Sequence, residues 1–133
     1  MKRISLKRRQ RLTEAQPWRK ELREQGYCDW CSVRAGDYFK GFPVQLEEHE
    51  IARGIHRQRA LDQPCATLLL CSRCHDELHR MAGDAQVCIG LALIRYRRPE
   101  HYSLSRYYEL TGRRWPDEAS IDLWTKRIFG GLK

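Results

Sequence analysis

The sequence predicts an α+β fold with one small core, on the basis of three observations. The chain has 133 residues, which suits one compact domain with extensions. Two Cys-x-x-Cys units lie 39 residues apart, and around the second unit the expected order is strand, loop, strand, helix. We divide the chain into a basic N-terminal arm and helix (1–26), a core domain (27–82) and a C-terminal helical extension packed on that core (83–133).

The N-terminal arm carries most of the positive charge. Residues 1–26 hold nine Lys/Arg and three Glu, a net charge of +6 out of +8 for the whole chain. The segment KRISLKRRQR repels itself and buries no apolar surface, so we expect it to be disordered or a loose helix. Phosphates attract such a segment, which makes nucleic acid the expected partner through Lys7, Arg8 and Arg9. A solubilising tail is the alternative.

A helix is expected between the arm and the core. Thr13 is a candidate cap, Pro17 suits a first turn, and Gly26 ends the pattern. Trp18 and Leu22 lie four residues apart and should face the body of the protein.

The core is expected to contain two strands and a helix. After the first cysteine pair, residues 32–45 contain Gly and Pro and predict a loop or short hairpin. Residues 44–51 and 66–71 predict strands, residues 52–64 an exposed loop, and residues 72–82 a helix.

Three helices are expected in the C-terminal extension, in residues 84–98, 104–112 and 117–129. The first segment also alternates as a strand would, but its length favours a helix. The aromatic residues of the C-terminal extension should pack its helices onto the core. The alternative is that these residues form an interaction surface of an accessory protein. The aromatic residues are Tyr102, Tyr107, Tyr108, Trp115 and Trp124.

The lengths of the apolar segments and the number of cysteines indicate the cellular compartment of the protein. No window approaches 18 consecutive apolar residues and the start lacks a secretory apolar stretch, so we expect a soluble, intracellular, cytoplasmic protein without a membrane partner. In a reducing compartment, six cysteines indicate metal ligands or redox sites rather than disulfides.

The two Cys-x-x-Cys units predict a structural zinc site. Each unit brings two thiolates to one ion, and two units complete a closed tetrahedral site, which stabilises the fold and leaves no position for substrate. A thioredoxin-like redox pair is the alternative. Cys65 and Cys88 are expected to be buried apolar residues. The proposed ligands are Cys28, Cys31, Cys71 and Cys74.

Three histidines predict a second metal site. His75 and His79 are one helical turn apart and project from the same face, and His49 ends the first predicted strand. Three protein ligands that leave room for water and substrate are typical of a catalytic ion. The alternatives are two surface histidines or a two-Cys, two-His finger. The 43 residues between Cys31 and His75 argue against the finger.

The motifs CDWC, LEEHEI and ATLLLCSRCHDELH resemble those of the HNH nucleases, which share the ββα-metal fold. The resemblance covers Cys28 to about Arg80. It implies a metal-dependent endonuclease that hydrolyses DNA phosphodiester bonds, with His49 as the first metal ligand and Glu50 in the position of the general base. A register shifted by one residue would instead make Glu48 the ligand and His49 the base.

One position departs from the family pattern. The family has an Asn in the middle of the motif, whereas this chain contains no Asn and has Ala66 near that place. Thr67 or Gln63 could substitute. The departure keeps open a second function, a non-catalytic zinc-stabilised module that binds nucleic acid.

The remaining site predictions concern the substrate and the ion. Arg53, Arg57 and Arg59 are candidates to contact phosphates, with an ordinary solvated loop as the alternative. The catalytic ion is expected to be one divalent cation, Mg²⁺, Mn²⁺, Ni²⁺ or Zn²⁺, acting as a Lewis acid. The pattern leaves the oligomeric state open.

Overall fold

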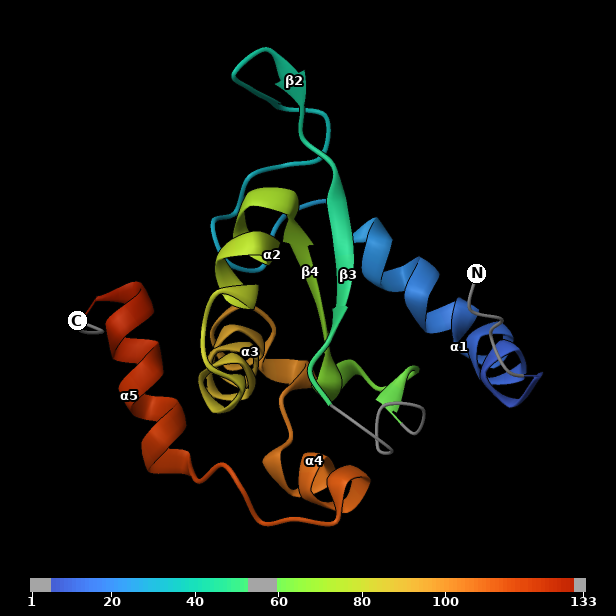
Figure 1. Ribbon diagram of the computed structural model, residues 1–133, viewed down its shortest axis with the longest axis vertical. Helices are drawn as coiled ribbons and strands as arrows, with labels where there is room; N and C mark the ends of the chain where they lie inside the picture. Colours follow the sequence, from blue (N-terminus) through green and yellow to red (C-terminus); the bar gives the residue numbers. More distant parts are fainter. Residues whose placement is uncertain (1–5, 53–59, 131–133) are drawn as a thin grey trace.

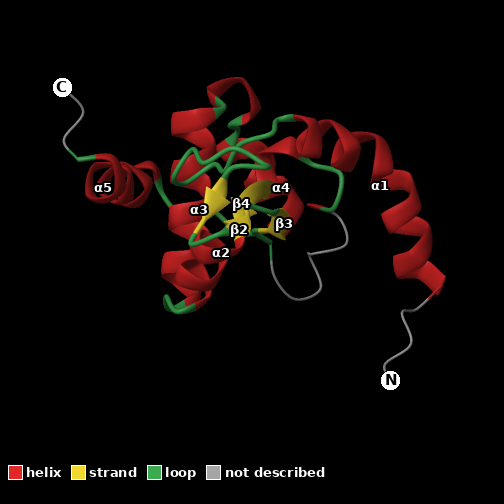
Figure 2. Cartoon of the chain, turned by 90° about the horizontal axis from the view of Figure 1, so that it is seen from above, coloured by secondary structure: helices red, strands yellow, loops and turns green. Residues whose placement is uncertain are grey.

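The computed structural model describes residues 6–52 and 60–130, apart from the side chains of residues 7, 8 and 11. Within these residues the protein is a mixed α+β fold with five α-helices and two two-stranded antiparallel sheets. Figures 1 and 2 show helix α1 and helix α5 on opposite sides of the strands. None of the helices in the described ranges has the length and apolar character needed to span a bilayer.

Helix α1 (Leu6–Glu24) begins earlier than the sequence suggested. Thr13 is not a cap, because its hydroxyl donates to the carbonyl of Arg9 inside the helix. Pro17 likewise lies within the helix, where it removes one backbone hydrogen bond, and the helix changes direction along its length (Figure 2). Leu22 is buried as expected, and Trp18 donates from its indole nitrogen to the Thr67 hydroxyl at 2.8 Å.

The strands form a small hairpin and a longer pair. Strands β1 (Tyr38–Phe39) and β2 (Phe42–Pro43) confirm the hairpin expected in residues 32–45. Strands β3 (Leu46–Glu50) and β4 (Thr67–Cys71) confirm the two expected strands and pair antiparallel, with His49 opposite Leu68. Every residue of β4 is buried, in agreement with its continuous apolar sequence.

Helix α2 (Ser72–His79) follows β4 without a connecting loop. Cys71 is its N-cap, and the Cys71 sulfur accepts from the backbone N–H of Cys74. The helix contacts both β3 and β4, so these three elements make one ββα unit. This unit positions all the candidate metal ligands except the first cysteine pair.

Helix α3 (Gly83–Arg97) is the central helix of the core, and residues 86–94 are buried without interruption. The helical alternative for this segment is therefore confirmed. Gly90 permits close packing against the strand side, because a Cβ atom there would lie 2.9 Å from Cγ1 of Ile51. Two short 3-10 helices, η3 (Pro64–Ala66) and η4 (Pro99–His101), also contact α3.

Helices α4 (Leu104–Thr111) and α5 (Glu118–Phe129) confirm the two remaining predictions. Helix α5 packs on α3, and α4 packs on η3. Tyr107 is buried, and Tyr102, Tyr108 and Trp124 are packed against the core. Trp115 differs from the expectation, because it remains 39% exposed in the connection between α4 and α5.

The segment expected to be an exposed loop is only partly described. Ala60 and Leu61 are buried rather than exposed, and the carbonyl of Leu61 accepts from Nε of Arg19. Arg53, Arg57 and Arg59 lie outside the described residues, so their predicted contact with phosphates stays a prediction.

Candidate metal centres

The four predicted cysteines converge at one point. Their sulfur atoms all lie within 4.8 Å of one another, and the Cys31 and Cys71 sulfurs are 3.7 Å apart. Four sulfurs bound at about 2.3 Å to one tetrahedral ion are about 3.8 Å apart. The cluster therefore has the ligand type and the spacing for a structural zinc ion, supplied by the segment before β1 and by the junction of β4 with α2.

Backbone N–H groups support two of these sulfurs. The N–H of Trp30 points to the Cys28 sulfur at 3.4 Å, and the N–H of Cys74 points to the Cys71 sulfur at 3.5 Å. A hydrogen bond from Cys74 lowers the pKa of Cys28 to about 4, whereas burial raises the pKa of Cys71. A thiolate at Cys28 is thus available as a ligand at neutral pH.

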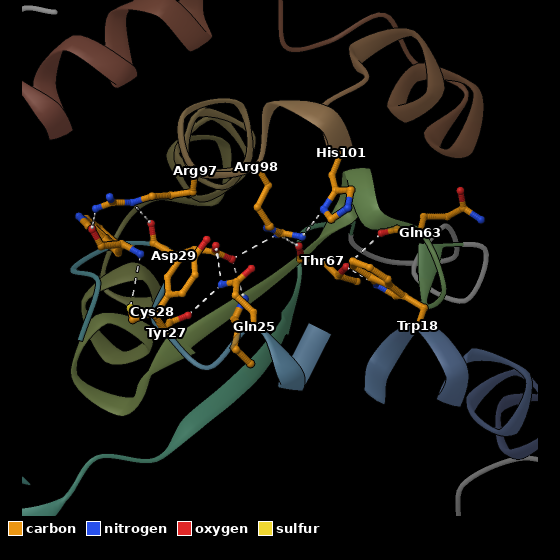
Figure 3. A network of polar contacts seen from close by, with 12 residues as sticks. Trp18, Gln25, Tyr27, Cys28, Asp29, Gln63, Thr67, Arg97, Arg98 and His101 are labelled. Atoms are coloured by element: carbon orange, nitrogen blue, oxygen red, sulfur yellow. Dashed lines mark hydrogen bonds and ion pairs between the residues drawn. The ribbon is translucent and has the colours of Figure 1, made fainter. Parts of the chain in front are cut away.

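The first Cys-x-x-Cys turn is fixed to the core through Asp29, which is fully buried (Figure 3). Its carboxylate accepts from the backbone N–H of Leu69, from Gln25 and from Nη2 of Arg98. Arg98 also donates to the carbonyl of Thr67 at 2.7 Å. Burial raises the pKa of Asp29, and the positive charge of Arg98 opposes that shift.

The neighbouring Arg97 makes a second connection to the same turn. Its guanidinium donates to the carbonyl oxygens of Asp29 and Trp30 at 3.1 and 3.0 Å. Arg97 and Arg98, at the end of α3, therefore bind the backbone of the Cys-x-x-Cys turn and the side chain of Asp29. Figure 3 shows Asp29 between Arg97 and Gln25.

The three predicted histidines form a second cluster, separate from the sulfurs. Nδ1 of His49 lies 3.1 Å from Nε2 of His75, and that atom lies 3.0 Å from Nε2 of His79. Imidazole nitrogens that share one ion at about 2.1 Å are about 3.0–3.4 Å apart. His49 comes from β3, and the other two come from consecutive turns of α2.

A carboxylate that sequence reasoning did not assign lies behind the histidines. Oε2 of Glu47 contacts Nδ1 of His75, which directs Nε2 of that ring towards the other two imidazoles. A carboxylate in this position fixes the tautomer and orientation of a metal-binding histidine. The signal was present in the sequence, because residues two apart on a strand share a face and Glu47 precedes His49 by two.

Glu50 and Glu48 lie on the opposite face of β3, towards α1. Oε1 of Glu50 accepts from Nη2 of Arg19 at 2.7 Å, and both side chains are at most 10% exposed. Glu48 pairs with Arg23 at 2.9 Å. The structure therefore brings neither carboxylate to the histidine cluster, and the catalytic role expected of Glu50 stays a prediction.

The residues near the position of the family's Asn are buried or hydrogen-bonded to other parts of the protein. Ala66 and Thr67 are fully buried, and the Thr67 hydroxyl donates to the carbonyl of Gln63. The side chain of Gln63 accepts from Arg106 and donates to Asp62. Thr67 and Gln63 thus have partners away from the three histidines.

The remaining predicted site residues are described only in part. Arg9 is exposed on α1, whereas the side chains of Lys7 and Arg8 lie outside the described residues. Cys65 and Cys88 are buried as expected, and burial raises the pKa of both thiols.

The chain is thus a small α+β protein with a four-cysteine cluster that could hold structural zinc. Beside it lies a separate cluster of three histidines. Comparisons with protein-family models, curated proteins and solved structures found no match for this chain.

Proposed function

We propose that the protein is a metal-dependent endonuclease of the HNH type that hydrolyses phosphodiester bonds of DNA. The observation that carries this proposal is the convergence of His49, His75 and His79 on one point of a ββα unit. A purely structural domain has no need of a second cluster of ligands beside a closed four-cysteine cluster.

The two clusters have different roles in this proposal. The four cysteines hold Zn²⁺ and stabilise the fold. The three histidines hold one divalent cation, Mg²⁺, Mn²⁺, Ni²⁺ or Zn²⁺, which supplies Lewis acidity for the charge on the scissile phosphate and the departing oxygen.

The side chains around the histidines orient ligands and accept protons. Glu47 holds the ring of His75 in place through Nδ1. Glu50 remains the candidate to take a proton from water, and to do so its carboxylate must exchange the ion pair with Arg19 for a position near the substrate. In the shifted register His49 would take this role.

DNA is the proposed substrate because the chain carries a net charge of +8, and residues 1–26 alone carry a net charge of +6. The proposed phosphate contacts are Lys7, Arg8 and Arg9 in the arm, and Arg53, Arg57 and Arg59 before β4.

A second candidate function is a zinc-stabilised nucleic-acid-binding module without catalysis. Two observations favour it: Glu50 pairs with Arg19, and Thr67 and Gln63 have partners outside the histidine cluster. In this alternative the histidines bind a metal ion without hydrolysis.

Nicking of supercoiled plasmid DNA distinguishes the two functions. We expect nicking by the wild-type protein with at least one of the four divalent ions, and a loss of about 10²-fold or more in His75→Ala. Glu77→Ala is the matched control, because Glu77 is an exposed residue of the same helix that pairs with Arg80. The absence of nicking with every ion, together with intact DNA binding, would support the non-catalytic module instead.

A further inference from the structure

The hairpin of β1 and β2 exposes three aromatic side chains. Tyr38 and Phe42 are each 74% exposed and Phe39 is 43% exposed. We call residues 38–43 the aromatic hairpin. Figure 1 shows it at one end of β3, beyond α2 and away from the main body of the fold. Solvent exposure of several neighbouring aromatic rings is unfavourable in a monomer and marks a binding surface.

The turn of the aromatic hairpin has a defined geometry. Lys40 and Gly41 form a two-residue connection in which both φ angles are positive, at 51° and 83°. This conformation is that of a type I′ turn, which matches the twist of the two strands, and it is unusual for a lysine. Phe39 and Phe42 face each other across the pair, so their rings lie on the same side.

Cations surround these rings. The guanidinium of Arg73 lies 4.3 Å from the ring centre of Phe39, and the Lys40 amine lies 5.5 Å from it on the turn. Arg73 lies in the first turn of α2, between Cys71 and Cys74, so the residue that contacts Phe39 belongs to the same turn as the second cysteine pair. Asp37 is the one acidic residue in residues 34–44, and its carboxylate accepts from the backbone N–H of Arg34.

A small cleft lies beside the hairpin, with a volume of about 130 Å³ and Phe42, Val44 and Arg73 in its lining. Pockets for drug-sized ligands measure about 300–1,000 Å³. This cleft is therefore too small for such a ligand. An apolar cavity of about 150 Å³ holds one benzene molecule, so the cleft has room for about one aromatic ring at most.

We propose that the aromatic hairpin stacks on unpaired bases of the DNA strand. This inference rests on the proposed function for its choice of DNA as the partner. Exposed aromatic faces beside Arg and Lys are the groups that bind single-stranded nucleic acid, because every base offers a face for stacking and every linkage a phosphate for a cation. An acidic peptide would satisfy the cations but would leave the three rings in water.

The position of the aromatic hairpin predicts where the bases lie along the strand. The chain runs directly from Phe42 into β3 and reaches His49 after seven residues. Seven extended residues span at most about 23 Å. The duplex rise of about 3.4 Å per nucleotide is the smallest spacing that applies, so the bases on Phe42 lie at most about seven nucleotides from a phosphate at the histidines.

Binding of fluorescein-labelled DNA tests the proposal. Anisotropy titrations compare a single-stranded oligonucleotide with a blunt duplex, for wild type and for Tyr38→Ala/Phe42→Ala. We expect the double variant to bind the single strand at least about tenfold more weakly, and to bind the duplex within about twofold of wild type. Leu123→Ala is the matched control, because it removes an apolar side chain that is 48% exposed on α5, and it should change neither affinity.

A second variant separates stacking from charge. Lys40→Asn removes the cation but keeps a residue that accepts a positive φ. The slope of log affinity against log salt concentration for single-strand binding should therefore become shallower by the amount that one phosphate contact contributes. Tyr38→Phe/Phe42→Tyr keeps both rings and should restore the affinity of the single strand.

Two outcomes overturn the proposal: unchanged single-strand affinity in a folded double-alanine variant, and an equal loss for both DNA forms. The proposed hydrolysis is measured separately by plasmid nicking. If nicking fails with every ion while the double-alanine variant selectively loses the single strand, the hydrolase proposal falls and the stacking surface stands. If the wild type nicks plasmid DNA and the double-alanine variant keeps its affinity for the single strand, the stacking surface falls and the hydrolase proposal stands.

Discussion

The carboxylate of Glu47 contacts Nδ1 of His75, and this contact joins β3 to α2 on the side of the histidine cluster. Because Nδ1 is engaged, Nε2 of the same ring is the nitrogen that faces His49 and His79. The orientation of the cluster therefore depends on a residue that need not touch an ion itself.

Glu47→Gln tests that dependence. An amide is a weaker acceptor than a carboxylate, so we expect the affinity of the histidine cluster for a divalent ion to fall by about 10–100-fold. Isothermal titration with Mn²⁺ or Ni²⁺ measures it. Glu48→Gln is the matched control, because Glu48 is the next residue of β3 and pairs with Arg23 on the other face. Equal affinities for wild type and Glu47→Gln would contradict the role given to Glu47.

Cys28→Ser tests the cysteine cluster. Loss of one thiolate should remove close to one equivalent of tightly bound zinc per chain and lower the melting temperature, since binding of the ion contributes to folding. Elemental analysis and thermal unfolding measure these two changes. Cys88→Ala alters another buried cysteine outside the cluster and should keep the zinc. A Cys28→Ser protein with full zinc content would refute the site.

Glu50→Gln separates catalysis from structure. If Glu50 accepts the proton from water, its replacement should lower the nicking rate at saturating metal by about 10²–10⁴-fold. The variant also weakens a nearly buried ion pair, which should cost about 1–3 kcal/mol of stability. Arg19→Gln breaks the same pair from the other side and should lose stability while it retains nicking. Full nicking by folded Glu50→Gln would leave Glu50 with a structural role alone.

Arg98→Ala tests the network behind the first cysteine pair. The substitution leaves the charge of Asp29 buried without its cation, and such losses cost about 3–5 kcal/mol. Urea unfolding measures the change. Arg95→Ala is the matched control from the last turn of α3, just before Arg98, because its ion-pair partners Glu118 and Asp122 are more than half exposed and such pairs contribute about 0–1 kcal/mol. A similar loss of stability in both variants would show that the buried pair of Arg98 and Asp29 contributes no more than an exposed pair.

Local sequence patterns predicted the elements better than their ends. The continuous apolar run of β4, the length of the apolar segment of α3 and the helical spacing in α5 located these elements, because such patterns are local in the sequence. The start of α1 was misplaced at Thr13, since its hydroxyl also finds an acceptor within a helix. The spacing of cysteines and histidines predicted both clusters for a similar reason: ligands of one ion must be near each other.

The residues that support the clusters could not be predicted in the same way. Asp29 and Arg98 are 69 positions apart in the sequence, and their pairing depends on how α3 packs against β4. The pairing of Glu50 with Arg19 likewise depends on the path of α1. Long-range packing decides such contacts, and a single sequence carries no local signal for them.

Cys74 and His75 are consecutive residues in the first turn of α2, yet they belong to different clusters. Both Cα atoms belong to one hydrogen-bonded helical turn, so rotation of that turn moves both side chains together. The thiol cluster fixes this rotation at the beginning of the helix, where Cys71 caps it. Binding of an ion at the four sulfurs should therefore help to align the three imidazoles, and by reciprocity an ion at the imidazoles should strengthen binding at the sulfurs.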